Sequence, residues 1–248
     1  MNLIEFFKRM FINRLCLLCD DPIDKDQKLP ICDDCLEDWD NLLETRCNRC
    51  GEDRHTCKCL PRIAKKNFNV CCWSVFYTPS KPDELNLSNL LVYKLKYSKY
   101  RDCINFCAEM MKNSLIECCY KRGINYKEYA VTYSPRRWHN RVRYEFDQAR
   151  ELAKRIAELL ELDFVEALQN IGTDEQKRLS AIERRRNAQE SYTLKKNFEN
   201  KHKKYFLVDD IMTTGATLVY CARLLYGVGA TDVIPVTYAK DNYKYRGD

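Results

Sequence analysis

The sequence places eight of its 15 cysteines between residues 16 and 59. Six of these form C-x2-C pairs, and the last two form a C-x-C pair. A C-x2-C turn directs two thiolates to one point, and two such turns make the tetrahedral sulfur site that suits structural zinc. We predict one zinc at Cys16, Cys19, Cys32 and Cys35, and a second at Cys47, Cys50, Cys57 and Cys59.

The spacing leaves other ligand sets open. The first cysteine pair can instead share a metal with the third, and the second with the fourth. His55 can also replace Cys57 or Cys59 as a ligand. A structural role is favoured over a catalytic one, because catalytic zinc usually keeps an open position and uses histidine more often. The seven remaining cysteines are expected to be small buried hydrophobic residues.

Charge is distributed unevenly along the chain. Residues 1–60 carry 9 basic and 13 acidic side chains, whereas the rest carries 33 and 23. A basic body favours phosphate-bearing partners, whether nucleotide, nucleic acid or anionic lipid. No apolar run has the length of a transmembrane helix, and Glu5, Lys8 and Arg9 interrupt the apolar start of the chain. We therefore expect a cytoplasmic protein with no transmembrane segment and no signal peptide.

Apolar strands and amphipathic helices alternate after residue 66. This alternation is typical of a parallel sheet with helices on both faces, so we predict an α/β fold with a small cysteine-rich domain before it. Strands are expected at residues 70–77, 129–133, 205–208 and 233–238. Helices are expected at residues 85–95, 100–120, 146–162, 180–187 and 216–226.

The apolar run at 205–208 leads into two carboxylates and a turn rich in threonine. Open α/β sheets bind ligands at the carboxyl ends of their strands, and a turn that opens a helix presents N–H groups to phosphate. Glycine in that turn would let the backbone approach the phosphate closely. The carboxylates can accept hydrogen bonds from ribose hydroxyls or hold a metal on the sugar, whereas a simple helix cap needs only one such residue. We predict a phosphoribose site at Asp209, Asp210, Thr213, Thr214, Gly215 and Thr217.

This segment resembles the phosphoribosyltransferase signature, a strand followed by D-D and T-T-G-x-T. With the head cysteines, nearly the whole chain resembles the ComF family of competence-associated proteins, a double zinc ribbon fused to a phosphoribosyltransferase-like body. The matching stretches are the head cysteines, 95–97, Arg136-Arg137 to Arg143, 146–149, Gln176, 179–180, 184–187 and the Asp-Asp/Thr-Thr-Gly motif. Within the family pattern R-G-F-N-Q-A, Glu145 stands in place of glycine and Asp147 in place of asparagine.

The resemblance implies a type I phosphoribosyltransferase fold that binds 5-phosphoribosyl 1-pyrophosphate with magnesium. It implies a double zinc-ribbon domain at residues 1–66 and a phosphoribosyltransferase-like domain at 67–248. It also implies a role in the uptake of single-stranded DNA during natural transformation, with a competence helicase or a membrane channel as partner.

Two arginine-rich segments, 134–150 and 177–186, suit either of two ligands. Arginine binds phosphate bidentately and aromatic rings stack on bases, so these segments fit single-stranded DNA or a hood over pyrophosphate. The residues that we expect to make these contacts are Arg136, Arg137, Arg141, Arg143, Arg184 and Arg185. An active transferase of nucleobase or amine metabolism is the alternative function. An adaptor with a vestigial site is a third, which the intact threonine turn disfavours.

Overall fold

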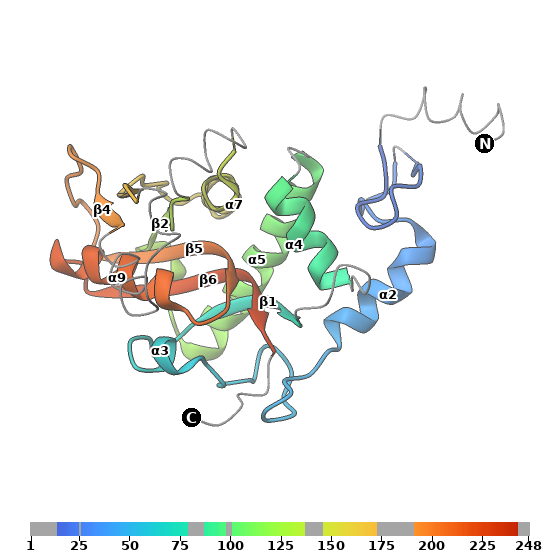
Figure 1. Cartoon of the computed structure of the whole chain (residues 1–248), viewed down its shortest axis with the longest axis horizontal. Helices are drawn as coiled ribbons and strands as arrows, with labels where there is room; N and C mark the ends of the chain where they lie inside the picture. Colours follow the sequence, from blue (N-terminus) through green and yellow to red (C-terminus); the bar gives the residue numbers. More distant parts are fainter. Residues whose placement is uncertain are drawn as a thin grey trace, which may run out of the picture.

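A computed structural model describes residues 14–24, 26–78, 87–97, 101–136, 146–172 and 191–242. Its centre is a parallel sheet of strands β1 (Cys72–Tyr77), β2 (Ala130–Tyr133), β5 (Lys204–Met212) and β6 (Asp232–Asp241), in the order β1-β6-β5-β2 (Figure 1). The chain order and the spatial order differ, so the last strand lies beside the first.

The strands are apolar because both faces of the sheet are covered. In β5, Tyr205 and Leu207 lie in the core on one face, and Phe206 and Val208 lie in the core on the other. All four side chains are fully buried. A strand buried on both faces reads as a continuous apolar run, which is why this segment was recognisable from the sequence.

Helices α5 (Arg101–Arg122) and α7 (Gln148–Leu160) cover one face of the sheet, and α4 (Leu87–Tyr97) packs beside α5. Helix α9 (Ala216–Gly227) covers the other face, next to the short helix α3 (Arg62–Lys65). A small antiparallel sheet of β3 (Leu168–Asn170) and β4 (Tyr192–Leu194) packs against α9. A 3-10 turn, η2 (Tyr126–Glu128), leads into β2. In Figure 1, α7 lies above the strands and α3 below them.

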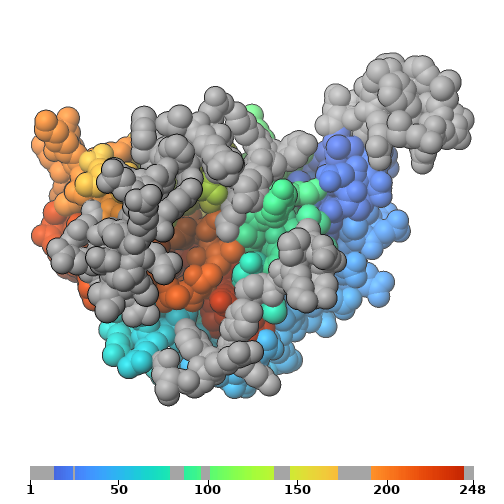
Figure 2. Space-filling view, in the orientation of Figure 1, coloured from blue at the N-terminus to red at the C-terminus, as the bar shows by residue number. Residues whose placement is uncertain are grey.

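The cysteine-rich head contains helix α2 (Asp33–Leu43), which the sequence analysis did not predict. Its buried Trp39 contacts Phe106 of α5 edge to face, with ring centroids 5.0 Å apart. Lys94 of α4 pairs with Asp20 of the first cysteine loop at 2.7 Å. The head and α4 therefore meet side by side, where Figure 2 shows blue and green surfaces in contact.

The predicted α/β fold is confirmed, including the four strands and the helices α4, α5, α7 and α9. Two strand ends were wrong: the strand expected to end at Val208 continues to Met212, and the strand expected to end at Tyr238 continues to Asp241, so that the two extensions pair with each other. The helix expected at 180–187 lies outside the described residues. Among the described helices, none has the length and hydropathy needed to cross a bilayer.

Candidate functional site

The extension of β5 places two adjacent carboxylates inside a strand. Successive side chains of a strand point to opposite faces, so Asp209 faces the α9 side and Asp210 the α7 side. Asp210 is buried, and its Oδ2 accepts a hydrogen bond from Gln148 Nε2 of α7 at 2.8 Å. Its Oδ1 accepts from the N–H of Ile211 at 2.7 Å, and Asp209 Oδ1 accepts from the N–H of Asp210 at 2.9 Å.

These carboxylates favour a cationic or hydrogen-bond-donating ligand. Burial, followed by the neighbouring charge of Asp210, raises the pKa of Asp209 well above its ordinary value, although the Ser134 side chain opposes the shift. A divalent cation or a pair of hydroxyl donors would relieve this repulsion. Gln148 Oε1 is a buried acceptor with no partner among the described residues. The donor set therefore fits a magnesium-bound sugar phosphate, since Mg²⁺ prefers oxygen ligands and keeps several of its waters.

A cleft of about 390 Å³ opens at the carboxyl ends of the parallel strands, next to these carboxylates. Its walls come from the ends of β1, β2 and β5, the start of α7, and the small β3–β4 sheet. Burial raises the pKa of Tyr192 of β4 to about 12, although the side chains of Thr217 and Asn170 oppose the shift, so its hydroxyl is a neutral donor. The lining residues are Tyr77, Ser134–Arg136, Gln148, Ala149, Asn170, Tyr192, Asp209–Ile211, Thr213 and Thr217.

The structure distributes the predicted phosphoribose residues over two roles. Thr213 and Thr217 line the cleft together with the two aspartates. Thr214 Oγ1 accepts from the N–H of Ala216 at 3.3 Å, which helps to begin α9. Gly215 has a φ of +76°, and a Cβ on it would lie 2.8 Å from the Cβ of Ala64. Glycine therefore allows the turn to pack against α3, a role that the sequence did not suggest.

Of the six predicted arginines, the described residues include Arg136, which lines the cleft. Its N–H donates to Asp147 Oδ2 at 3.1 Å, and Asp147 Oδ1 accepts from the N–H of Arg150 at 3.3 Å. Asp147, which replaces asparagine of the family pattern, thus caps α7 and fixes the chain that carries Arg136. The other predicted arginines, Arg137, Arg141, Arg143, Arg184 and Arg185, lie outside the described residues.

The sequence missed the residues that complete the cleft. Gln148 was noted only as part of a family pattern, and Ser134, Asn170 and Tyr192 were not selected as site residues. Their contribution depends on tertiary contacts between α7, the small sheet and β5. The signal that could have found Gln148 is its position in the first turn of a helix whose start faces the strand ends.

The head cysteines form two clusters, in which the first cysteine pair groups with the second and the third with the fourth. Within each quartet, all four sulfur atoms lie within 4.8 Å of one another. Cys32 is the residue before α2, so the second pair of thiols opens a helix. Backbone N–H groups of Leu18 and Cys32 donate to Cys16 Sγ at 3.4 and 3.3 Å, as in sites where sulfur carries negative charge. The donor sets fit two structural zinc ions.

The second quartet, at Cys47, Cys50, Cys57 and Cys59, does not use His55. His55 Nδ1 lies 2.9 Å from Glu117 Oε2 of α5 instead. Burial raises the pKa of Cys57 to about 12 in the absence of metal. Burial acts in the same direction on Cys47, but N–H donors from Arg49 and Cys50 outweigh it and lower the pKa to about 7. One thiol of the quartet is therefore prepared for metal, and zinc would displace the protons from the others.

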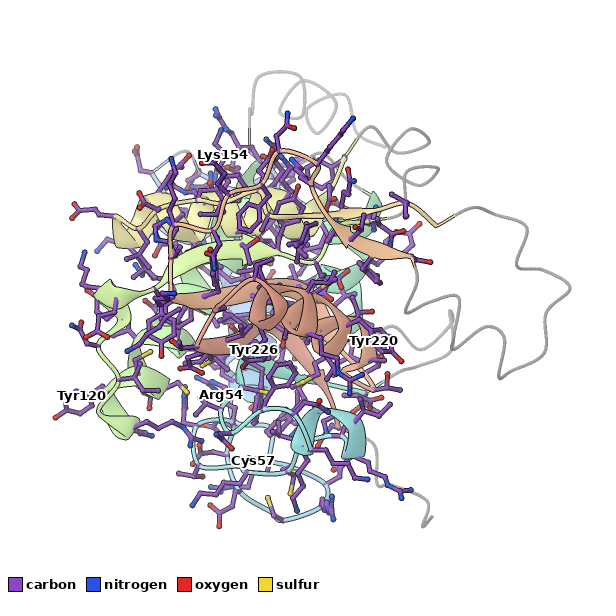
Figure 3. All side chains as sticks on the ribbon, turned by 90° about the vertical axis from the view of Figure 1, so that its left-hand side faces the viewer. Arg54, Cys57, Tyr120, Lys154, Tyr220 and Tyr226 are labelled. Atoms are coloured by element: carbon purple, nitrogen blue, oxygen red, sulfur yellow. The ribbon has the colours of Figure 1, made fainter. Side chains whose placement is uncertain are left out.

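A second hollow, of about 740 Å³, lies between this quartet and the end of α5. The cations that line this hollow come from four separate segments, so no single stretch of the sequence indicated the hollow. They are Arg49, Lys58, Lys65, Lys121 and Arg122. Tyr120, in the same helical turn as Lys121, is 87% exposed. Figure 3 labels Tyr120 and Cys57 at the lower end of the molecule and Lys154 of α7 at the upper end.

The phosphoribosyl transferase domain family matches residues 147–247. That range begins at the cap of α7 and includes both aspartates, the threonine turn and β6. No curated protein matches the chain. The chain therefore joins a phosphoribosyl transferase-type domain to two four-cysteine clusters with the donor set of structural zinc.

Proposed function

We propose that the protein is a phosphoribosyltransferase-like protein of the ComF type. It binds 5-phosphoribosyl 1-pyrophosphate with magnesium at the strand-end cleft, binds single-stranded DNA, and acts in DNA uptake with a competence helicase or membrane channel. The observation that carries the first part is the convergence of Asp209, Asp210 and the unpartnered Gln148 oxygen beside a threonine turn.

Each group of the cleft has a task in this proposal. Asp209 and Asp210 accept hydrogen bonds from the ribose hydroxyls, and Thr213, Thr214, Gly215 and Thr217 bind the 5-phosphate at the start of α9. Arg136 lies where it can contact pyrophosphate, and we assign the same role, or a role with DNA, to the five other arginines. Magnesium, when bound, neutralises charge on the pyrophosphate.

We further propose that residues 1–66 form the zinc-binding domain and 67–248 the phosphoribosyltransferase-like domain. Both zinc ions are structural in this proposal, since four thiolates leave no open position for a substrate. The described contacts of the head fit this assignment, because its cysteine loops pack on α3, α4 and the sheet and lie outside the strand-end cleft.

Calorimetric titration with magnesium phosphoribosyl pyrophosphate tests the cleft. Hydrogen bonds to charged groups contribute about 1.5–3 kcal/mol each, so Asp209→Asn and Asp210→Asn should each weaken binding at least about tenfold. Asp163→Asn makes the same chemical change on an acid whose side chain is 76% exposed, and it should bind like wild type. Absence of binding by wild type, or equal binding by all four proteins, contradicts the proposal.

Release of pyrophosphate separates binding from catalysis. If the alternative function holds, and the protein is an active transferase of nucleobase or amine metabolism, some nucleobase or amine will accelerate that release. The acceleration will depend on Asp209 and Asp210. A panel of acceptors that produces no release above background supports a binding role.

The basic hollow near the end of α5 favours nucleic acid as the second ligand. Cations that follow a backbone, together with exposed aromatic rings on which bases stack, are the features of single-strand binding surfaces. Here five cations and one acid, Glu52, line the hollow, and the exposed Tyr120 precedes Lys121 in α5. We propose that single-stranded DNA lies along this surface in addition to any arginine outside the described residues.

Fluorescence anisotropy with an oligothymidine tests this surface. The slope of log affinity against log salt is negative, and each lost phosphate contact makes it less negative by about 0.7 for single strands, so Lys58→Gln/Lys121→Gln should make it less negative by about 1.4. Lys154→Gln/Lys196→Gln removes the same charge from exposed positions away from the hollow and should change the slope much less. Tyr120→Ala should weaken binding about fivefold or more, because stacking contributes about 1–3 kcal/mol per base. Equal slopes for the two double variants would exclude this surface.

A further inference from the structure

Lys240, near the end of β6, is a lysine buried within the protein. Its relative exposure is 3%. Lysine is rarely buried to this extent unless it is paired, since its charge loses the solvation of water. Neither the strand-end cleft nor the basic hollow includes this side chain, so its burial needs its own explanation.

In the part of the chain that the structure describes, two aromatic rings and one sulfur contact the ammonium of Lys240. Its Nζ lies 4.3 Å from the ring centroid of Trp73 and 5.0 Å from that of Phe76, both on β1. It also lies 3.5 Å from the sulfur of Cys57 in the second quartet. The aromatic faces attract the cation but carry no net charge, so the sulfur is the partner that can balance it.

The positive charge of Lys240 is balanced only when the second quartet holds zinc. Four thiolates around Zn²⁺ carry a net charge of −2, whereas four protonated thiols carry none. An N–H···S hydrogen bond from an ammonium is charge-assisted when the sulfur is a thiolate. Metal in the quartet therefore favours buried Lys240, and Lys240 in turn favours retention of the metal.

We propose that Lys240 is the outer-sphere partner of the second zinc site. Its ammonium donates to the Cys57 thiolate and fastens the zinc loop to the sheet. In the register of the sheet, Lys240 pairs with Phe76 of β1 and Met212 of β5. Through β6, the second zinc is thus connected to β1 and β5, two of the strands whose ends support the strand-end cleft.

Zinc release from the full-length protein tests this assignment. A chromophoric chelator reports the release, and a Cys35→Ser background removes the first site so that one phase belongs to the second. Loss of an outer-sphere partner typically costs 10–100-fold in metal affinity. Lys240→Met should therefore release zinc about 10–100-fold faster, while Lys240→Arg, which keeps the charge, should stay within a few fold of the parent.

The first zinc site supplies the matched control. In the protein that keeps both quartets, the first-site phase is the one that Cys35→Ser removes, and Lys240→Met should leave the rate of that phase unchanged. Release at the parent rate from the second site, or equal acceleration at both sites, would overturn the proposal. The second outcome would mean general destabilisation rather than a contact with one thiolate.

A measurement on the wild-type protein decides the matter if the variants do not fold. Lysine acetylation, read by mass spectrometry before and after zinc removal, should find Lys240 protected in the loaded protein and reactive afterwards. Lys58, which is exposed on the same loop, should react equally in both states. Protection of Lys240 that persists after zinc removal would show that its burial does not depend on the metal.

Discussion

The two cysteine quartets have the same chemistry but different surroundings. The first, at residues 16–35, packs with α2, α4 and α5 and has one buried thiol, Cys16. The second, at residues 47–59, has two buried thiols, Cys47 and Cys57, which share a core with Trp73 of β1 and Leu225 of α9. The first cluster therefore lies beside the α/β domain, whereas the second is part of the layer that covers the α9 face of the sheet.

The attachments of the two clusters differ in the same way. Apart from the packing of Trp39 on Phe106, the first is joined through the ion pairs of Lys94 with Asp20 and Arg14 with Asp102, whose carboxylate side chains are 63% and 50% exposed. The second is joined through Asn242, just after β6, whose side chain accepts from the N–H of Asn48 at 2.9 Å and donates to the carbonyl of Arg46 at 3.0 Å. Buried hydrogen bonds to backbone contribute more than exposed ion pairs, so the second attachment should be the stronger.

The largest expected effect comes from removing one ligand from each cluster. Cys35 and Cys59 are both half-buried, so Cys35→Ser and Cys59→Ser form a matched pair. Structural zinc contributes about 10–16 kcal/mol in small zinc-dependent peptides, comparable with the whole stability of a domain. We expect Cys59→Ser to lose most of the urea-induced unfolding transition of the sheet, and Cys35→Ser to retain it with one zinc equivalent. Equal losses in the two variants would remove the distinction between the clusters.

Gly215→Ala should produce the next largest effect, because it disturbs the contact between α3 and the threonine turn. The left-handed backbone costs about 1–3 kcal/mol for a residue with a side chain, and overpacking against Ala64 costs about 1–3 kcal/mol more. Gly123→Ala is the control, since Gly123 has a φ of +65° and nothing within 4 Å of a Cβ. The difference between the unfolding free energies of the two variants, measured with denaturant, gives the cost of the clash with Ala64 alone. Equal unfolding free energies would mean that α3 moves to accept the added Cβ at no cost.

The smallest expected effects compare the two attachments. Asn242→Ala leaves the Asn48 N–H and the Arg46 carbonyl without their partner, which should cost about 1–3 kcal/mol of unfolding free energy. Lys94→Ala removes a partly exposed ion pair and should cost about 0–1 kcal/mol. Thermal denaturation at fixed zinc concentration compares them, and a larger loss in Lys94→Ala would reverse the proposed ranking.

The sequence predicted those parts of the fold that local patterns specify. Apolar runs marked all four strands of the main sheet, and the amphipathic period of 146–162 marked α7. The extension of β5 to Met212 was not predictable, because Asp209 and Asp210 are poor strand formers whose pairing depends on the length of β6. Helix α2 was missed because five of its 11 residues are acidic and its stability comes from Trp39 packing on Phe106.

The same limit applies to the candidate site: residues close together in the sequence were predicted, and residues that only the fold brings together were not. The carboxylates and threonines could be selected because they stand together in the chain. The grouping of cysteines into quartets stayed open, and so did the role of His55, because spacing does not show that Glu117 of α5 lies beside that imidazole. Lys240 and Asn242 were missed because their partners, Cys57 and Asn48, are far away in sequence.

The strand order has a consequence for biosynthesis. Strand β1 pairs with β6, about 160 residues later in the chain. Ribosomes deliver the chain from its amino end, so the second quartet leaves the exit tunnel well before Lys240 and Asn242 exist. We expect nascent chains to hold the first metal early and to acquire the second securely only when the final strand has been made. A translational arrest before residue 232 would then leave a polypeptide that yields its second metal readily to competing thiols in the cell.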